Sequence, residues 1–235
     1  LIRVADSIPA LSMVTKYEYD AYGRNSTITY PSGIVLTNIY NVNGYLQEIK
    51  YGSETLWKLN SENSYGQPVN YSIGNLANSL TVALTYDVYG RLKTKTTGQM
   101  KQTYVYDNAS GNLLSRDYRI SGAPGGLTES FSYDNLNSLT GSQVTGAGLM
   151  SVTYSPDGNI NTKTDAGSYT YDPSKQNAVT SITGSNGTIS LADQVITYNG
   201  NNLATRIEED NSSYAIYYNP LKQRIKTVCT PVGGP

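Results

Sequence analysis

The sequence predicts an all-β protein built from tandem antiparallel β-hairpins. Three observations predict this fold class: a short phrase that returns along the whole chain, apolar residues spaced two apart before each copy, and turn-forming residues at a fixed position inside it. The clearest copy is LTYDVYGRLKTKTTG, residues 84–98. No segment shows the periodicity of an amphipathic helix, so helices are not expected.

The repeated phrase is anchored by a tyrosine that precedes Asp, Asn or Ser. About ten copies, about 21 residues apart, account for nearly all of the 235 residues, and in one degenerate copy Glu62 occupies the tyrosine position. Repetition at a fixed period indicates a repeat architecture. We therefore expect a single domain, 1–235, with 1–16 as the end of a preceding repeat and insertions near 116–130 and 175–195. The repeat-defining residues are Tyr19, Asp20, Gly23, Tyr40, Asn41, Gly44, Tyr86, Asp87, Gly90, Arg91, Tyr106, Asp107, Gly111, Tyr133, Asp134, Tyr154, Gly158, Tyr171, Asp172, Tyr198, Asn199, Tyr218 and Asn219.

Each copy contains the residues of a tight hairpin turn. In YDVYG, Asp87 is position i of a β-turn, where its side chain accepts hydrogen bonds from the turn, and Gly90 is position i+3. Glycine tolerates the positive φ that follows such a turn, which predicts a three-residue hairpin loop with a glycine bulge. Asn137 replaces this glycine in one copy. At Lys222 a side chain stands there, at a cost of roughly 1 kcal/mol if the residue is left-handed.

The segments on both sides of each turn have the pattern of strands. Before the turn, apolar residues lie two apart, as in Leu84 and Tyr86 or Ile216 and Tyr218, which places both on one face of a sheet. After the turn comes an alternating, β-branched segment such as RLKTKTT. Each repeat therefore consists of two strands, and we expect about twenty short strands in total.

Tyrosine is the dominant aromatic residue: the chain has 22 Tyr, one Phe and one Trp. If successive hairpins pair side by side, each repeat tyrosine lies next to its counterpart, and we expect a row of ring contacts worth ~0.5–1.5 kcal/mol per pair. Phenylalanine would bury as much area but has no polar tip. The choice of tyrosine favours a single-layer wall, in which the ring packs on its neighbours and the hydroxyl reaches water or a backbone group.

Composition argues against several classes of function. Charged residues are 15% of the chain, the net charge is −1 and no Lys/Arg run occurs, so neither nucleic acid nor an acidic membrane is an expected partner. No stretch approaches a membrane span. The chain has no histidine, the usual general base and the commonest metal ligand. We therefore expect no enzyme, with no catalytic residue, cofactor or metal; the acidic cluster 208–210 is interpreted as a solvated hairpin tip and Cys229 as incidental.

The phrases YEYDAYGR, TYDVYGRL, YVYDNASGNLL and YYNPLKQRIKTV resemble the Rhs/YD-repeat proteins, which include bacterial Rhs toxins, the B and C components of insecticidal Tc toxins, and animal teneurins. The resemblance covers essentially the full chain. It implies one long, curved sheet that spirals into a hollow shell, with an enclosed toxin polypeptide in bacterial members and a support for adhesion modules in teneurins. The chain has fewer repeats than such a shell needs and lacks the aspartyl self-cleavage segment, so we expect an open fragment of wall, cut from a longer protein.

Two hypotheses for function follow. The first is a non-catalytic wall segment that encapsulates and shields a toxin or other polypeptide cargo, with the remaining repeats of the shell and the cargo as partners. The alternative is a cell-surface adhesion or carbohydrate-binding module that uses exposed tyrosine faces with neighbouring Asn and Asp. Both predict a larger protein that is secreted or displayed at the cell surface, with its signal outside this segment.

Overall fold

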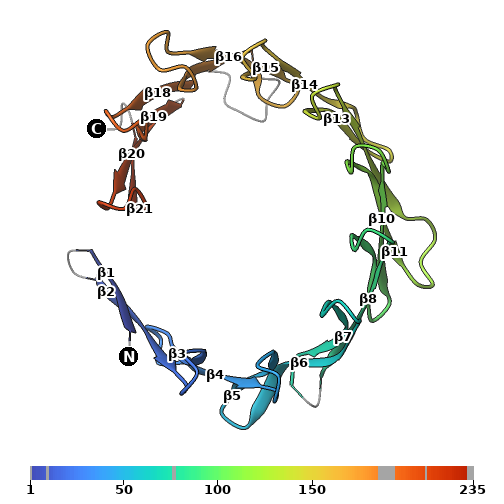
Figure 1. Cartoon of the computed structure of the whole chain (residues 1–235). Helices are drawn as coiled ribbons and strands as arrows, with labels where there is room; N and C mark the ends of the chain where they lie inside the picture. The colour runs from blue at the N-terminus through green and yellow to red at the C-terminus, as the bar shows by residue number, and fades with distance from the viewer. Residues whose placement is uncertain (1, 9–10, 76–77, 185–193, 210, 232–235) are drawn as a thin grey trace. The chain divides into compact units, whose positions relative to one another are not determined.

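The computed structural model describes residues 2–8, 11–75, 78–184, 194–209 and 211–231 (Figure 1). These residues form 21 β-strands and no helix, and none of the described segments could therefore cross a membrane as a helix. All strand pairs given by the structure are antiparallel. The predicted all-β fold of tandem hairpins, with about twenty short strands, is confirmed.

The chain divides into two compact units, which are described separately. Unit 1 comprises Leu1–Tyr106 and Ser115–Thr128, and unit 2 comprises Asp107–Leu114 and Glu129–Pro235. Strands β11 (Leu113–Ile120) and β12 (Leu127–Tyr133) contribute residues to both units. The remaining strands of unit 1 are β1 (Ile2–Ile8), β2 (Leu11–Tyr19), β3 (Asn25–Thr29), β4 (Val35–Tyr40), β5 (Leu46–Tyr51), β6 (Glu54–Glu62), β7 (Pro68–Ile73), β8 (Leu80–Tyr86), β9 (Leu92–Thr97) and β10 (Met100–Tyr106).

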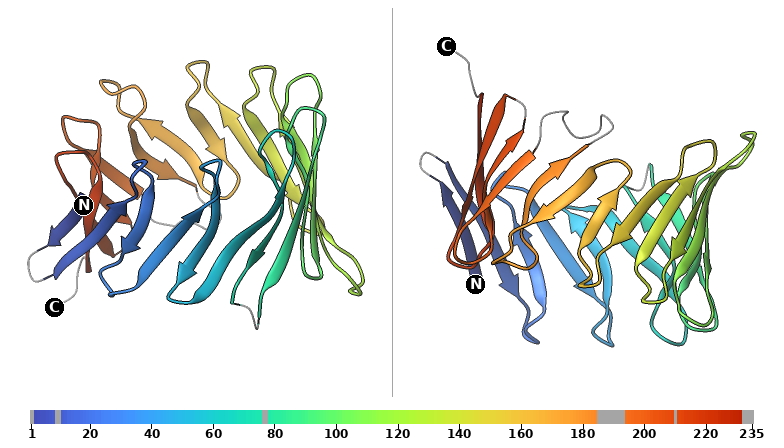
Figure 2. Two further views of the ribbon diagram at one scale, coloured as in Figure 1. Left: turned by 60° about the horizontal axis from the view of Figure 1, so that its bottom comes forward. Right: turned by 90° about the horizontal axis from the view of Figure 1, so that it is seen from above.

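Unit 2 has the same kind of elements. Its other strands are β13 (Leu139–Val144), β14 (Met150–Tyr154), β15 (Ile160–Lys163), β16 (Gly167–Tyr171), β17 (Val179–Thr183), β18 (Gln194–Tyr198), β19 (Ala204–Glu209), β20 (Ser212–Tyr218) and β21 (Arg224–Pro231). Consecutive strands pair from β1 to β10 in unit 1 and from β12 to β21 in unit 2. Within each unit the described strands form a single-layer meander, with consecutive hairpins side by side (Figure 2).

The sequence predicts that 1–16 ends a preceding repeat and that insertions lie near 116–130 and 175–195. The structure locates these three segments as follows. Residues 1–16 overlap β1 and most of β2, and β2 runs on to the first repeat tyrosine, Tyr19. The segment 116–130 covers the larger part of β11, the loop 121–126 and the first half of β12. The segment 175–195 contains β17, but its residues 185–193 lie outside the described part.

The two faces of the sheet differ in burial, as the period of two predicts. Val82 and Ile216 lie on the same face as the repeat tyrosine of their strand and are buried. On the opposite face, the residues that directly precede a repeat tyrosine, such as Thr85, Val105 and Tyr217, are exposed. Buried apolar residues are few in the described chain: Val82, Ala166, Ala178, Ile182 and Ile216. A conventional two-layer core is therefore missing from these residues, and the stability must come from the strand ladder and from contacts between neighbouring hairpins.

Candidate functional site

The repeat turns are held by hydrogen bonds among their own residues. At Asp87, the side-chain Oδ1 accepts hydrogen bonds from the amides of Tyr89 and Arg91, both over 2.9 Å. The amide of Gly90 donates to the carbonyl of Asp87 over 3.0 Å, and the amide of Asp87 donates to the carbonyl of Arg91 over 2.9 Å. Gly90 has φ +77°. The turn is thus the three-residue loop with a glycine bulge, and the same bonds recur at Asp20.

Where another residue replaces the glycine, the backbone keeps its left-handed conformation. Asn137 has φ 64°, Asn202 has φ 58° and Lys222, for which the sequence predicts this conformation, has φ 63°. Asparagine tolerates such angles better than lysine, whose side chain offers no local hydrogen bond in compensation. The turn geometry is therefore imposed by the hairpin even where the sequence fits it poorly.

Most of the repeat tyrosines fasten their hairpin to the one before it. The hydroxyl of Tyr86 donates a 2.7 Å hydrogen bond to the carbonyl of Pro68 in the preceding hairpin. Pairing between β7 and β8 extends only to Asn70 and Ala83, so the carbonyl of Pro68 lies beyond the end of this ladder. We call this bond the tyrosine clasp, because it supplies a donor where the strands of two hairpins no longer pair.

The clasp recurs in both units with the same register. For the clasps of Tyr40, Tyr86, Tyr106, Tyr154, Tyr171 and Tyr218, the acceptor lies two residues before the first residue of its strand that pairs with the strand of the tyrosine. The further clasps are Tyr40 to Asn25 (2.7 Å), Tyr106 to Leu92 (3.0 Å), Tyr133 to Leu113 (2.9 Å), Tyr154 to Leu139 (2.8 Å), Tyr171 to Ile160 (2.8 Å) and Tyr218 to Ala204 (2.8 Å). Burial of the phenol raises the pKa of Tyr86 and of Tyr106 above the ordinary value. Burial of the phenol also raises the pKa of Tyr198, the repeat tyrosine of β18.

The expected row of stacked tyrosine rings is wrong as a description of these contacts. The close ring pair in the described residues is Trp57 with Tyr71, whose centroids are 6.1 Å apart, and neither is a repeat-defining tyrosine. The hydroxyl, not the ring face, carries the bond from one repeat tyrosine to the preceding hairpin. The reason that tyrosine is used rather than phenylalanine is therefore a main-chain carbonyl that needs a donor.

An arginine lies between two tyrosine rings at one junction of hairpins. The guanidinium carbon of Arg91 is 4.8 Å from the ring centroid of Tyr89, in its own turn, and 4.6 Å from that of Tyr106, in the next repeat. Its Nε donates to Oδ2 of Asp87 over 2.7 Å. The planar cation thus binds its own turn and the ring of the following hairpin at once.

A second junction of the same kind was not singled out from the sequence. Arg24 lies 4.9 Å from the ring centroid of Tyr22 and 4.4 Å from that of Tyr40, and its Nε donates to Oδ2 of Asp20 over 2.7 Å. The sequence signal was available, because Asp20–Arg24 repeats the D-x-x-G-R spacing that includes the predicted Arg91. Tyr22, the second tyrosine of the phrase, is not among the repeat-defining residues.

These arginines shift the acid–base behaviour of the turn carboxylates. Partial burial acts to raise the pKa of Asp87, but hydrogen bonds from the Arg91 amide and guanidinium and from the Tyr89 amide outweigh it, so the pKa lies below its ordinary value. The same balance, with Arg24 and Tyr22 as donors, lowers the pKa of Asp20. Both turn carboxylates are therefore held as anions.

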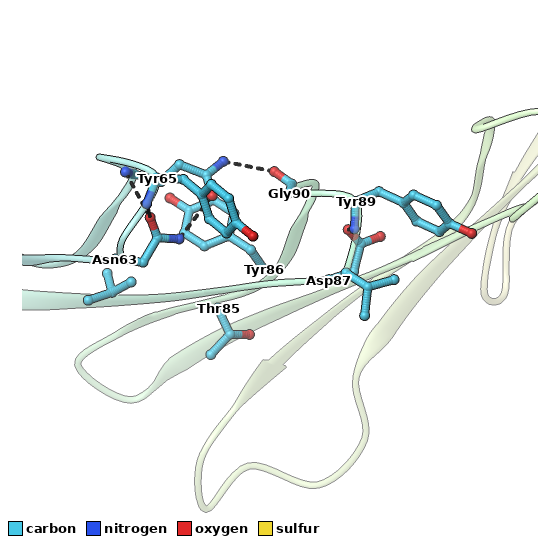
Figure 3. A pocket seen from close by; sticks show the side chains of 10 residues that line it. Asn63, Tyr65, Thr85, Tyr86, Asp87, Tyr89 and Gly90 are labelled. Atoms are coloured by element: carbon cyan, nitrogen blue, oxygen red, sulfur yellow. Dashed lines mark hydrogen bonds between the residues drawn. The ribbon is translucent and has the colours of Figure 1, made fainter.

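At a third junction, two amide side chains take the places of the aspartate and the arginine, and a groove lies beside them (Figure 3). Asn63 stands where the other two junctions have Asp20 or Asp87, and Gln67 stands where they have Arg24 or Arg91. The Nδ2 of Asn63 donates to Oε1 of Gln67 over 3.0 Å, and the Nε2 of Gln67 donates to the carbonyl of Gly90 over 2.9 Å. The groove has a volume of about 940 Å³ and is lined by Asn63, Tyr65, Gln67, Val69, Thr85, Tyr86, Asp87, Val88, Tyr89 and Gly90.

Polar side chains link neighbouring turns in unit 2 as well. The Nδ2 of Asn112 donates to Oδ1 of Asn137 over 2.8 Å, and the Nδ2 of Asn159 donates to the carbonyl of Gln176 over 2.7 Å. The Nζ of Lys175 donates to the carbonyl of Asn199 over 3.2 Å. Side chains in or directly after several turns therefore reach the next hairpin in both units.

The acidic cluster has ordinary partners. Glu208 forms an ion pair with Arg206 at 2.6 Å, and Glu209 accepts a hydrogen bond of 3.0 Å from Gln194; Asp210 lies outside the described residues. Glu208 and Glu209 belong to the end of β19. No group of three or more His, Cys, Asp or Glu residues suited to a metal ion occurs in the ranges that the structure covers, and Cys229 is exposed.

Comparison with solved structures shows which known fold the chain shares. No family model and no curated protein matches the chain. Among solved structures, the chain is similar to TcdB2-TccC3-Cdc42, with a TM-score of 0.56 and 14% identity over 93% of this chain and 16% of the other. TcdB2-TccC3 gives a TM-score of 0.54 and 13% identity over the same shares. The chain thus spans about one sixth of the length of these Tc toxin structures, and at this identity the likeness concerns the fold: the chain has the tandem hairpin fold of the Rhs/YD-repeat shell proteins that its sequence resembles.

Proposed function

We propose that the chain is a non-catalytic wall segment of an Rhs/YD-repeat shell, which encloses and shields a polypeptide cargo inside a larger secreted or surface protein. The observation that carries the proposal is the tyrosine clasp. In a single-layer sheet, each hairpin needs a fastening that does not depend on a second layer. The ladder together with the Tyr86 and Tyr106 clasps supplies it from within the wall itself.

The fastening has a direct consequence for shielding. Proteases cleave segments that open locally, and local opening is easiest where main-chain hydrogen bonds are few. The clasp adds a bond at the point where pairing between two hairpins ends, for example at Pro68. A clasped wall should therefore open less often at the seams between hairpins than a sheet without the hydroxyls.

The face opposite the tyrosines is suited to an enclosed chain that must later leave. Thr85, Thr153, Thr170 and Thr197 lie there, directly before repeat tyrosines, and all are exposed. These hydroxyl-bearing side chains alternate with apolar ones that share the face, such as Val105, and so limit hydrophobic adhesion to a polypeptide. Such a face holds cargo by confinement rather than by affinity.

The experiment uses the full-length protein that carries this chain. A triple Tyr40→Phe, Tyr86→Phe, Tyr106→Phe variant removes three clasps, and the control changes the exposed Tyr22, Tyr65 and Tyr89 to Phe. Added protease is followed by mass spectrometry of the segments outside the repeats. We expect those segments to be protected in the wild type and the control and to be digested about tenfold faster in the clasp variant. Equal digestion in all three proteins, or the lack of any protected segment, would contradict the proposal.

A further inference from the structure

The groove between the turns at Asn63 and Asp87 has the size of a ligand site. Its volume of about 940 Å³ lies at the upper end of the ~300–1,000 Å³ usual for small-molecule pockets. Its walls come from the turn 63–67, the start of β7, the end of β8 and the turn 87–90, all in unit 1. The groove is at the turn edge of the hairpins, next to the Tyr86 clasp, and wall formation does not require it to be open.

The chemistry of this junction differs from that of the other two. At the Asp20 and Asp87 turns, a guanidinium lies between the turn tyrosine and the clasp tyrosine of the next repeat. Here Gln67 takes that position with a shorter, neutral side chain whose amide is already bonded on both sides. The space that arginine fills elsewhere therefore stays open, and it carries no cation.

The carboxylate in the groove also offers no free charge. Asp87 accepts hydrogen bonds from the amides of Tyr89 and Arg91 and from the guanidinium of Arg91. The remaining polar lining consists mainly of the phenols and the amide groups of the first turn, because the hydroxyl of Thr85 is bonded to that of Thr94 over 2.7 Å. A charged ligand would find no counter-ion here, because the one ion pair at this edge is closed.

The groove also has an exposed aromatic ring, that of Tyr65. The side chain of Tyr65 is 87% exposed, and its turn is held by hydrogen bonds of 3.0 Å from the amides of Tyr65 and Gln67 to Oδ1 of Asn63. Tyr65 and Tyr86 lie on one side of Gly90, whereas the ring of Tyr89 points away from them (Figure 3). A ring on a fixed turn loses little conformational entropy when a ligand stacks on it.

We propose that this groove binds a neutral glycan. A pyranose ring has an apolar C–H face, which suits the exposed ring of Tyr65, and a rim of uncharged hydroxyls, which suits the phenol groups and the amide groups of the first turn. The combination of an exposed aromatic face with neutral hydrogen-bonding groups and no free ion selects this class over phosphates, acidic sugars and cations. Binding at the turn edge would attach a wall segment to a glycan surface without disturbing the ladder.

The test uses the whole chain and immobilised maltohexaose, cellohexaose, xylohexaose, mannohexaose and chitohexaose, followed by calorimetry with the sugar that binds. We expect at least one of them to bind, and Tyr65→Ala to weaken binding about tenfold or more. The matched control is Tyr22→Ala, since Tyr22 has the same place in another turn and is 84% exposed but lies outside the groove. This control should bind as the wild type does.

A second variant closes the groove without removing the ring. Asn63→Asp with Gln67→Arg installs the ion pair of the other junctions, and we expect it to abolish binding while circular dichroism and urea unfolding show the fold retained. Lack of binding to every neutral oligosaccharide at about 10 mM, a preference for sialylated or sulfated glycans, or equal binding by the wild type and Tyr65→Ala would each overturn the proposal.

Discussion

The hydroxyl of Tyr86 donates a 2.7 Å hydrogen bond to the carbonyl oxygen of Pro68. The two residues belong to different hairpins, and both lie beyond Asn70 and Ala83, the last residues that β7 and β8 pair with each other. A side chain thus continues a main-chain ladder by one more hydrogen bond. A partly buried carbonyl without a donor is costly, which explains why this position needs a hydroxyl and not only an aromatic ring.

Removal of a single clasp hydroxyl should be measurable. Tyr86→Phe deletes the donor to Pro68 and leaves the ring in place, so we expect a loss of about 1 kcal/mol in the free energy of unfolding by urea. Amide hydrogen exchange at Asn70 and Ala83, the nearest paired residues, should become faster. The control is Tyr89→Phe, whose ring is 65% exposed and should change stability little. Equal losses in both variants would show that the clasp adds nothing.

The arginine between two rings should not be replaceable by lysine. Arg91→Lys keeps the charge but loses the flat guanidinium that stacks on Tyr89 and Tyr106 and bonds Asp87. We expect a loss of about 1 kcal/mol in unfolding free energy. Arg224→Lys, at an exposed position of β21, is the matched control and should be neutral. If the two variants are equally stable, the stacking geometry contributes nothing to stability.

Acid should weaken the turns through their aspartates. The pKa of Asp87 is lowered in the folded chain: burial opposes the shift, and the hydrogen bonds from Arg91 and Tyr89 outweigh it. For Asp134, whose pKa is also lowered, the leading cause is the hydrogen bond from the Ser138 amide. A folded pKa below the unfolded one means that the stabilisation is present above about pH 4 and is lost as the pH falls through the folded value.

The corresponding variant is Asp87→Asn. Asparagine keeps the turn, as Asn41 and Asn63 do in their hairpins, but has no proton to gain. Unfolding free energies measured between about pH 7 and pH 2 should therefore fall less steeply for the variant than for the wild type. Parallel curves would contradict the assignment of the acid effect to this carboxylate.

One turn should become more stable when its side chain is removed. Lys222 has φ 63°, a conformation that glycine adopts without a steric penalty, so Lys222→Gly should raise the unfolding free energy by roughly 1 kcal/mol. Leu221→Gly, one residue earlier and without a positive φ, should lower it by about 0.5 kcal/mol because only the entropy cost of glycine remains. Destabilisation by both substitutions would mean that the strain at Lys222 is relieved by its surroundings.

The degenerate repeat shows how far the local pattern reaches. Glu62 pairs with Pro68 across its hairpin as a repeat tyrosine would, so the turn phrase alone predicts the hairpin there. Glu62 lies in β6, and this strand has an additional register shift between Leu59 and Ser61. The repeated phrase does not predict this shift. This irregularity arises from pairing with the neighbouring strand, and a single sequence does not specify it.

The sequence by itself determined the hairpins. The Asp-x-x-Gly turns, the two faces of each strand and the left-handed Lys222 follow from residues within a few positions of one another, where hydrogen bonding and φ preferences act directly. The ion pair from Asp20 to Arg24 belongs to this class as well, because both residues lie in one turn.

Only the tertiary structure decided what joins one hairpin to the next. The sequence predicted contacts between tyrosine rings, whereas the structure has a hydroxyl on a carbonyl at Tyr86 and a guanidinium between rings at Arg91. These contacts depend on where the ladder between β7 and β8 ends and on how closely neighbouring turns approach. Such distances are set by the pairing register of whole strands, which the repeated phrase leaves open.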